Sequence, residues 1–133
     1  MRTFQQTISK ECSISGIGLH TGKKSSLKFI PAKINHGIKF QRIDLEHKPI
    51  IKADVDNVID ISRGTTLSEN NGKVSTVEHL LAALVGLQID NVLIQIDGPE
   101  VPIMDGSSIE FIKCLEKCKL KDQDAVRNYL EIP

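Results

Sequence analysis

The chain has 133 residues, of which 40% are hydrophobic and 26% charged, a composition typical of one globular domain that excludes a disordered or fibrous protein. Seventeen basic residues balance seventeen acidic ones, so charge gives no reason to expect nucleic acid or an anionic membrane as a partner. Only 4% of the residues are aromatic, so isoleucine, leucine and valine must fill most of the core.

The cysteines and the hydropathy indicate a cellular location. Cys12, Cys114 and Cys118 form no C-x-x-C pair, and their odd number in a chain without a recognisable signal peptide predicts reduced thiols. Cys118 is expected in the core as a small apolar residue. No apolar run approaches the roughly 20 residues that a membrane-spanning helix needs. We therefore expect a cytoplasmic protein with no transmembrane segment.

Residues 1–53 are expected to form short strands separated by turns. We place these strands at residues 5–12, 25–30, 37–43 and 49–53. Apolar and polar residues alternate in the second and third strands, as in antiparallel strands with one buried face. Residues 14–22 contain several glycines and are predicted to form a connection between strands.

A hairpin and a helix are predicted in the middle of the chain. The hairpin pairs residues 65–67 with 73–75 and turns at Asn70-Asn71-Gly72, whereas residues 57–63 show no clear pattern. The helix is expected to run from Ser75 to about Gly86. Ser75 and Glu78 have the spacing of a capping box, in which each side chain satisfies a backbone N–H group of the other.

Both sides of this helix are expected to be covered. Val77, Leu80, Leu81 and Leu84 recur at helical spacing and form one apolar face. The opposite face carries side chains that are chemically useful or small enough for close approach: Glu78, His79, Ala82, Ala83 and Gly86.

The last third of the chain is expected to alternate strands and one helix. We predict a central strand at 91–97, an edge strand at 101–104, a helix at 107–118 and a polar linker at 121–124. Residues 129–133 have the pattern of a new strand. We therefore assign one domain to residues 1–126, and assign 127–133 to a linker or to the first strand of a missing second domain. The alternative is a terminal strand that folds back onto the first domain.

Glu78-His79 is the strongest candidate for chemistry. A catalytic zinc takes three protein ligands and a water, and a nearby carboxylate can act as general base. His79 could be the ligand and Glu78 the base, and a helix amino terminus disfavours the imidazolium form, which cannot coordinate metal. The structural alternative is that Glu78 completes the capping box and His79 has a hydrogen-bond partner. The two-histidine pattern H-E-x-x-H is absent, because Ala83 occupies the second position.

The other polar residues do not complete a metal site. Of the remaining histidines, His36 and His47 lie in polar connections where we expect them to be exposed, and His20 lies in the run of residues 16–22. This run lacks a glycine required by G-x-G-x-x-G, so it predicts tight turns instead of a nucleotide loop. The acidic residues Asp97, Glu100 and Asp105 could be paired carboxylates, but turn and cap roles are favoured.

Four segments together resemble the hallmark stretches of the UDP-3-O-acyl-N-acetylglucosamine deacetylases, a family of bacterial lipid A synthesis. They are GIGLHTG at 16–22, STVEHLLAAL at 75–84, IDN at 89–91 and GPEVPIMDGSS at 98–108. Their order and spacing match, and the resemblance covers essentially the whole chain. It implies an α+β fold: a two-layer sandwich of a small, mostly antiparallel sheet with two packed helices, the first of two similar domains.

The same resemblance implies a reaction and a set of site residues. The reaction is zinc-dependent hydrolysis of the 2-acetamido group of UDP-3-O-acyl-N-acetylglucosamine, with release of acetate. His79 would be a zinc ligand, Glu78 the general base and His20 a supporting residue near the site. The substrate pocket would be lined by Leu19, Gly64, Thr65 and Thr66.

In that family the other zinc ligands and most substrate contacts come from the second domain. We therefore expect the fragment alone to be inactive, to bind zinc weakly or not at all, and to self-associate through its uncovered helix face. The main alternative is a non-catalytic binding module on the same fold. A third reading is an unrelated zinc hydrolase in which His20 and an acidic residue converge on His79.

Overall fold

A computed structural model describes residues 4–62 and 64–127. The elements, in chain order, are β1 (Phe4–Ile8), β2 (Cys12–Ile17), β3 (Lys24–Pro31), β4 (Ile38–Arg42), β5 (Ile50–Lys52), the 3₁₀-helix η1 (Val55–Asn57), β6 (Val58–Asp60), β7 (Thr66–Glu69), β8 (Gly72–Ser75), α1 (Glu78–Gly86), β9 (Val92–Ile96), α2 (Ile109–Lys117) and β10 (Leu120–Val126). No helix in these two ranges is long and apolar enough to span a bilayer.

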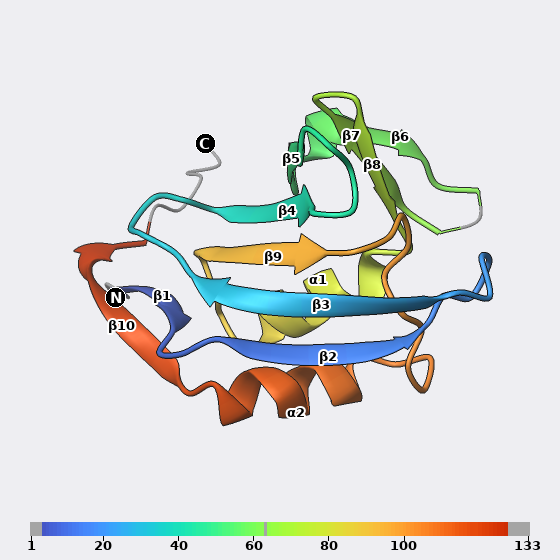
Figure 1. Cartoon of the computed structure of the whole chain (residues 1–133). Helices are drawn as coiled ribbons and strands as arrows, with labels where there is room; N and C mark the ends of the chain where they lie inside the picture. Colours follow the sequence, from blue (N-terminus) through green and yellow to red (C-terminus); the bar gives the residue numbers. More distant parts are fainter. Residues whose placement is uncertain (1–3, 63, 128–133) are drawn as a thin grey trace.

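A five-stranded sheet of order β2-β3-β9-β4-β5 forms the centre of the fold (Figure 1). The middle strand, β9, is antiparallel to β3 and parallel to β4, and the other neighbours are antiparallel. Ile94 on β9 stands opposite Phe29 on β3 and Phe40 on β4, and all three side chains are fully buried. The alternation predicted for β3 and β4 therefore directs their large apolar residues into one core.

The helices form the second layer of the sandwich. Figure 1 shows α1 behind the sheet, with α2 below it along the edge strand β2, and the two helices contact each other. Leu80, Ala83 and Leu84 of α1 and Phe111 and Leu115 of α2 are buried in the same cluster as the apolar side chains of the sheet. The predicted α+β two-layer sandwich, mostly antiparallel with two packed helices, is confirmed.

Two smaller sheets complete the domain. Strands β6, β7 and β8 form one, and β1 and β10 the other. The predicted hairpin is the β7–β8 pair, and its turn residues Asn70 and Asn71 have φ of 53° and 62°. Asparagine tolerates this left-handed region better than most residues, which explains the Asn-Asn-Gly turn.

The segment predicted as a connection at 14–22 is a strand in its first half. Residues Cys12–Ile17 form β2, paired with β3 along its whole length, while the strand predicted at 5–12 ends at Ile8. Gly16 suggested a turn, but its role is close packing: a Cβ there would lie 2.8 Å from Met104 Sδ and 3.0 Å from Pro102 Cβ. Pro102 and Met104 belong to residues 101–104, which are predicted to form an edge strand. In the structure these residues do not form a strand.

The predicted linker at 121–124 is also wrong. It lies inside β10, which pairs antiparallel with β1 more than 100 residues earlier. Asn91 holds this pair against the main sheet, because its amide donates to Gln5 Oε1 at 2.9 Å and to Gln123 Oε1 at 2.7 Å. β10 is largely exposed, so its polar composition resembles that of a loop. The strand predicted at 129–133 lies outside the described residues.

The capping box predicted at Ser75 does not form. Helix α1 begins at Glu78, its N-cap residue is Val77, and no side chain caps it. Ser75 instead belongs to β8, where its hydroxyl accepts a hydrogen bond from the Thr66 hydroxyl at 3.1 Å. Ser75 is part of the strand and not of the helix because the Ser75 backbone N–H donates to Pro99 O at 2.8 Å. Glu78 is thereby released from a capping role.

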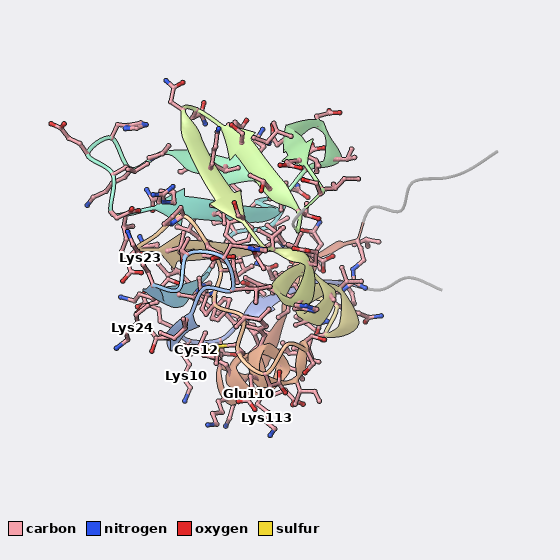
Figure 2. All side chains as sticks on the ribbon, turned by 90° about the vertical axis from the view of Figure 1, so that its right-hand side faces the viewer. Lys10, Cys12, Lys23, Lys24, Glu110 and Lys113 are labelled. Atoms are coloured by element: carbon pink, nitrogen blue, oxygen red, sulfur yellow. A yellow bond between two sulfur atoms is a disulfide. The ribbon has the colours of Figure 1, made fainter. Side chains whose placement is uncertain are left out.

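The cysteines differ from the expected set of three reduced thiols. Cys12 on β2 and Cys118 at the end of α2 are joined as a disulfide, with Cα atoms 5.9 Å apart, and Cys114 is free. Figure 2 shows Cys12 beside α2, with Lys10, Lys23, Lys24 and Lys113 directed outward. Cys118 is buried, as predicted.

Replacement of Phe29 by alanine should destabilise the fold strongly. Its ring is fully buried at the centre of the sheet, and such truncations typically cost about 3–5 kcal/mol. Phe4→Ala is the matched control, because that ring is 51% exposed. Chemical denaturation measures both changes, and equal losses would contradict the assignment of the core.

Candidate active site

The start of helix α1 carries Glu78 and His79 on a constrained turn. Thr76, between β8 and the helix, has a φ of 62°, which is unfavourable for a β-branched residue. The backbone N–H groups of Thr76 and Val77 both donate to Thr65 O, at 2.9 and 3.5 Å. The β7–β8 hairpin therefore sets the direction in which α1 begins. Strained backbone that is fixed by its surroundings is characteristic of functional sites.

Glu78 has a buried oxygen without a partner. Within residues 4–62 and 64–127, Glu78 Oε1 is the one buried side-chain nitrogen or oxygen atom that makes no hydrogen bond. Leaving such an atom unsatisfied typically costs about 1–3 kcal/mol. The cost makes sense if a donor from outside this part of the chain binds there, as the water or amine of a hydrolytic reaction would.

Gly64 faces the Glu78 carboxylate. A Cβ at Gly64 would lie 3.1 Å from Glu78 Oε2 and 3.5 Å from Oε1, and the residue has a φ of +96°. Both the backbone conformation and the close approach favour glycine. Gly64 also lines the neighbouring cavity, whereas Glu78 and His79 are not among its lining residues.

This cavity has a volume of about 180 Å³, and most of the residues that line it have polar side chains. Four separate segments line it, and they contribute His20, Thr21, Asp60, Gly64, Thr66, Ser75, Pro99 and Glu100. Three of the predicted site residues, His20, Gly64 and Thr66, therefore meet in one place. Of the other two predicted pocket residues, Leu19 is 58% exposed, and Thr65 contributes its carbonyl oxygen to the turn before α1.

Glu100 does not have the turn or cap role that the sequence favours. It is a buried hydrogen-bond acceptor that contacts two separate loops. Its side chain is 2% exposed, and its carboxylate accepts hydrogen bonds from the His20 N–H at 3.0 Å, the Thr21 N–H at 2.9 Å and the Thr76 hydroxyl at 2.7 Å. The neighbouring Asp105 does act as predicted, by accepting from the N–H and hydroxyl of Ser107 in a local turn, whereas Asp97 accepts from the Ser26 N–H on the adjacent strand β3. Only the Pro-Glu-Val-Pro context hinted that Glu100 differs, since apolar neighbours favour burial.

Burial alone would raise the pKa of the Glu100 carboxyl, because the charge loses its solvation. Hydrogen bonds from the Thr76 hydroxyl, the Thr21 and His20 backbone N–H groups and the Thr21 hydroxyl outweigh this effect, so the pKa lies below its usual value of 4.5. The group is therefore an anion at neutral pH.

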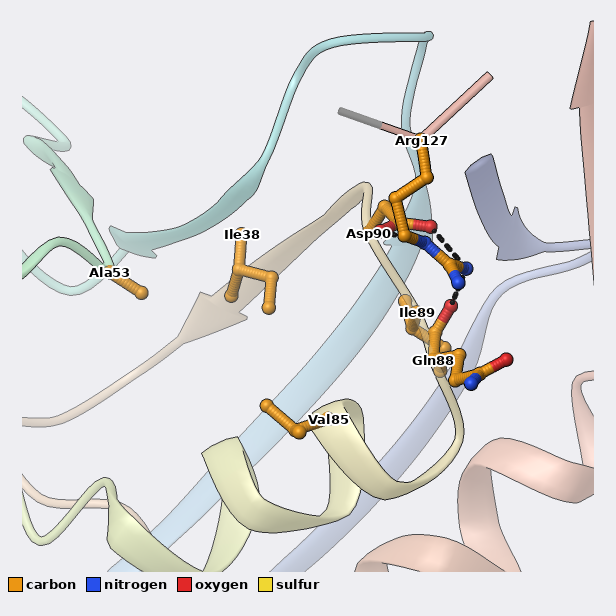
Figure 3. A pocket seen from close by; sticks show the side chains of 7 residues that line it. All are labelled: Ile38, Ala53, Val85, Gln88, Ile89, Asp90 and Arg127. Carbon is orange, nitrogen blue, oxygen red and sulfur yellow. Dashed lines mark hydrogen bonds and ion pairs between the residues drawn. The ribbon is translucent and has the colours of Figure 1, made fainter. Parts of the chain in front are cut away.

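A larger cavity, of about 360 Å³, lies at the other end of α1 (Figure 3). Val85 and Ile38 line it, together with the ion pair between Arg127 and Asp90, whose atoms Nε and Oδ1 are 2.8 Å apart. Asp90 also accepts the Gln6 N–H at 2.8 Å, so it ties β1 and the end of β10 to the segment before β9. This arrangement accounts for Asp90 structurally.

The described residues do not complete a zinc site. Residues 4–62 and 64–127 contain no group of three or more His, Cys, Asp or Glu side chains that could hold one ion. A catalytic zinc takes about three protein ligands. Glu78 and His79 could contribute to such a site only with ligands from outside the described chain. His20 and His79 form no such group with an acidic residue, as a self-contained site would require.

Fold and site together define an α+β domain with a carboxylate and a histidine at the start of one helix, near a small cavity lined by His20, Gly64 and Glu100. Residues 5–133 match the family described as UDP-3-O-acyl N-acetylglycosamine deacetylase, also called LpxC. The chain belongs to this family, which confirms the resemblance of the four sequence segments.

Similar proteins come from several bacteria. The chain is 51% identical to a bifunctional enzyme LpxC/FabZ of Bacteroides thetaiotaomicron over 94% of its own length and 27% of that protein. It is 47% identical to the protein of the same name from Chlorobaculum tepidum, over 99% of the chain and 28% of the relative. A UDP-3-O-acyl-N-acetylglucosamine deacetylase of Geobacter sp. strain M21 is 46% identical over 97% of the chain and 42% of the relative. The chain thus spans less than half of each relative.

Gly64→Ala should destabilise the protein more than an alanine at a comparable glycine. A left-handed backbone costs a non-glycine residue about 1–2 kcal/mol, and at Gly64 the methyl group also crowds Glu78. Gly37→Ala is the control, because its φ is +78° and nothing lies within 4 Å of the added Cβ. Denaturation curves compare the two, and an equal loss would contradict the close approach of Gly64 to Glu78.

Glu100→Gln should change how stability depends on pH. The folded-state pKa is lowered, so the stabilisation by Glu100 is complete above pH 4.5 and is lost as pH falls through the folded pKa. The difference in unfolding free energy between wild type and variant should be constant near neutrality and shrink in acid. The carboxyl groups of Asp44 and Asp105 also have lowered pKa values. They are present in both proteins, so their contributions cancel in the difference. A difference that grows on acidification would show that the sign is wrong.

Proposed function

We propose that this chain is the amino-terminal part of a zinc-dependent hydrolase that removes acetate from UDP-3-O-acyl-N-acetylglucosamine in bacterial lipid A biosynthesis. Membership of the deacetylase family supports the reaction. The observation that carries it for this chain is the buried, unpartnered Oε1 of Glu78, whose carboxylate faces Gly64 in the lining of the small cavity. A cytoplasmic location accords with a nucleotide-linked substrate.

Glu78 is the general base in this proposal. Its free oxygen accepts a proton from the attacking water, whose oxygen forms the new bond to the amide carbon. The carbon–nitrogen bond then breaks as the departing nitrogen takes up that proton, and acetate and the glucosamine amine are released. A buried, water-poor surrounding strengthens each electrostatic contact that Glu78 makes.

His79 supplies one metal ligand, and the remaining ligands come from a second domain of the same protein. When bound, zinc would polarise the amide carbonyl and lower the pKa of the attacking water. His20, Gly64 and Thr66 form this domain's part of the wall of the substrate pocket, and Leu19 and Thr65 are their neighbours in the sequence.

The second domain also covers surface that is open here. Ala82, Val85 and Gly86 of α1 are exposed, and Val85 is 72% exposed. A chain of residues 1–133 alone is therefore expected to lack activity, to hold little zinc and to self-associate through this face. A monomer by light scattering at high concentration would contradict the self-association.

The test is zinc stoichiometry and acetate release in the full-length protein and in residues 1–133. We expect both only in the full-length protein. Glu78→Gln there should lower kcat by about 10²–10⁴-fold with zinc retained, since the amide cannot accept the proton. Glu110→Gln is the matched control, as it removes a carboxylate from the first turn of α2.

Other outcomes would select another function. A full-length protein without zinc or acetate release would favour the non-catalytic binding module. Tightly bound zinc in residues 1–133 would favour a self-contained site.

A further inference from the structure

Glu100 connects two loops that are far apart in the sequence. One is the loop of residues 18–22, whose His20 and Thr21 N–H groups point at the carboxylate. The other is the Thr76 turn, whose hydroxyl donates to Glu100 Oε2 at 2.7 Å. These donors all require an acceptor, and an ionised carboxylate is the side chain that offers two acceptor oxygens without a donor.

The backbone around Glu100 is held as firmly as its side chain. Ser25 Oγ donates to Glu100 O at 2.8 Å, and the Val101 N–H donates to Ser75 O at 3.0 Å. With the Ser75 N–H bound to Pro99 O at 2.8 Å, the chain on both sides of Glu100 is fixed to the end of β8. The carboxylate therefore has a defined position relative to the residues that lead into α1.

Gly18 shows how closely the loop approaches this carboxylate. A Cβ at Gly18 would overlap Glu100 Oε1 and the Thr21 hydroxyl, although the backbone conformation there is open to any residue. A glycine is thus required at position 18 because the backbone packs directly against the Glu100 carboxylate.

We propose that Glu100 is a positioning residue of the proposed deacetylase site: it locks the His20 loop and the Thr76 turn together and so holds Glu78 and His79 in their working geometry. The inference rests on the proposed function. Thr76 precedes Glu78 by two residues, so a change in its left-handed backbone moves the start of α1 directly. His20 and Glu100 line the same cavity, so the loop that moves is a wall of the substrate space.

The test uses the full-length protein loaded with zinc, and compares Glu100→Gln with Asp97→Asn. Glutamine keeps the size of Glu100 but offers one acceptor oxygen and places an N–H₂ group against three donors. Asp97 lies in the same connection, accepts the Ser26 N–H at 2.7 Å and lines no part of the cavity. We expect Glu100→Gln to lower kcat by about 10–100-fold, as is usual for residues that orient a catalytic group. KM should change less than about 3-fold, since bound substrate meets Glu78 and His79 in the wrong geometry.

A second pair of variants keeps the proposal testable if Glu100→Gln does not fold. Thr76→Ala removes one donor to the carboxylate, and Thr76→Ser restores it. Alanine should reduce kcat several-fold and serine should recover it, which a purely structural loss at this position would not reproduce. All rates are compared at a temperature where near-ultraviolet circular dichroism shows each variant folded.

The outcomes separate the two proposals. A wild-type protein that releases no acetate overturns the proposed function. An active wild type with Glu100→Gln no slower than Asp97→Asn, or altered only in KM, overturns the role of Glu100 alone. Failure of Thr76→Ser to recover kcat also overturns it.

Discussion

The hydrogen bonds to the buried Glu100 carboxylate decide how the pieces of the candidate site meet. Two loops that are distant in the sequence, one at His20 and one at Thr76, donate hydrogen bonds to this one carboxylate. A buried charge is tolerable only if its lone pairs are satisfied, so each donor is needed for the others to remain in place. The left-handed Thr76, the glycine at position 18 and the depressed pKa of the carboxyl are three consequences of the same arrangement. Without it the turn before α1 would be held by the Thr65 carbonyl alone.

The same sequence motifs serve packing and chemistry together. In the segment around Glu78, Val77, Leu80 and Leu84 are buried against the sheet, while Glu78 and His79 are partly buried at the start of the helix. In the segment at 89–91, Ile89 is buried, Asp90 pairs with Arg127, and Asn91 binds both strands of the β1–β10 pair. The family motifs therefore mark positions where the backbone must be fixed as well as positions where a reaction can take place.

Three features remain uncompensated within residues 4–62 and 64–127. Glu78 Oε1 lacks a partner, Val85 is exposed, and the acidic and histidine side chains of the described residues form no metal-binding group. A domain stable on its own seldom keeps an unsatisfied buried oxygen and an exposed apolar helix face together. The chain covers 27–42% of the length of these relatives, and in the proposed function the remaining ligands and the cover come from the rest of the protein.

The sequence by itself determined the α+β class, the core strands β3, β4 and β9, both helices, the Asn-Asn-Gly hairpin and the family. These follow from local periodicity, turn chemistry and motif order, which a short window contains. Only the tertiary structure decided that residues 121–124 belong to a strand, that Gly16 permits close packing and that Ser75 leaves the helix to join β8. It also decided the role of Glu100. In each case the partner lies elsewhere in the chain, so the deciding energy comes from pairing, burial or hydrogen bonding across the fold, and local composition carries little trace of it.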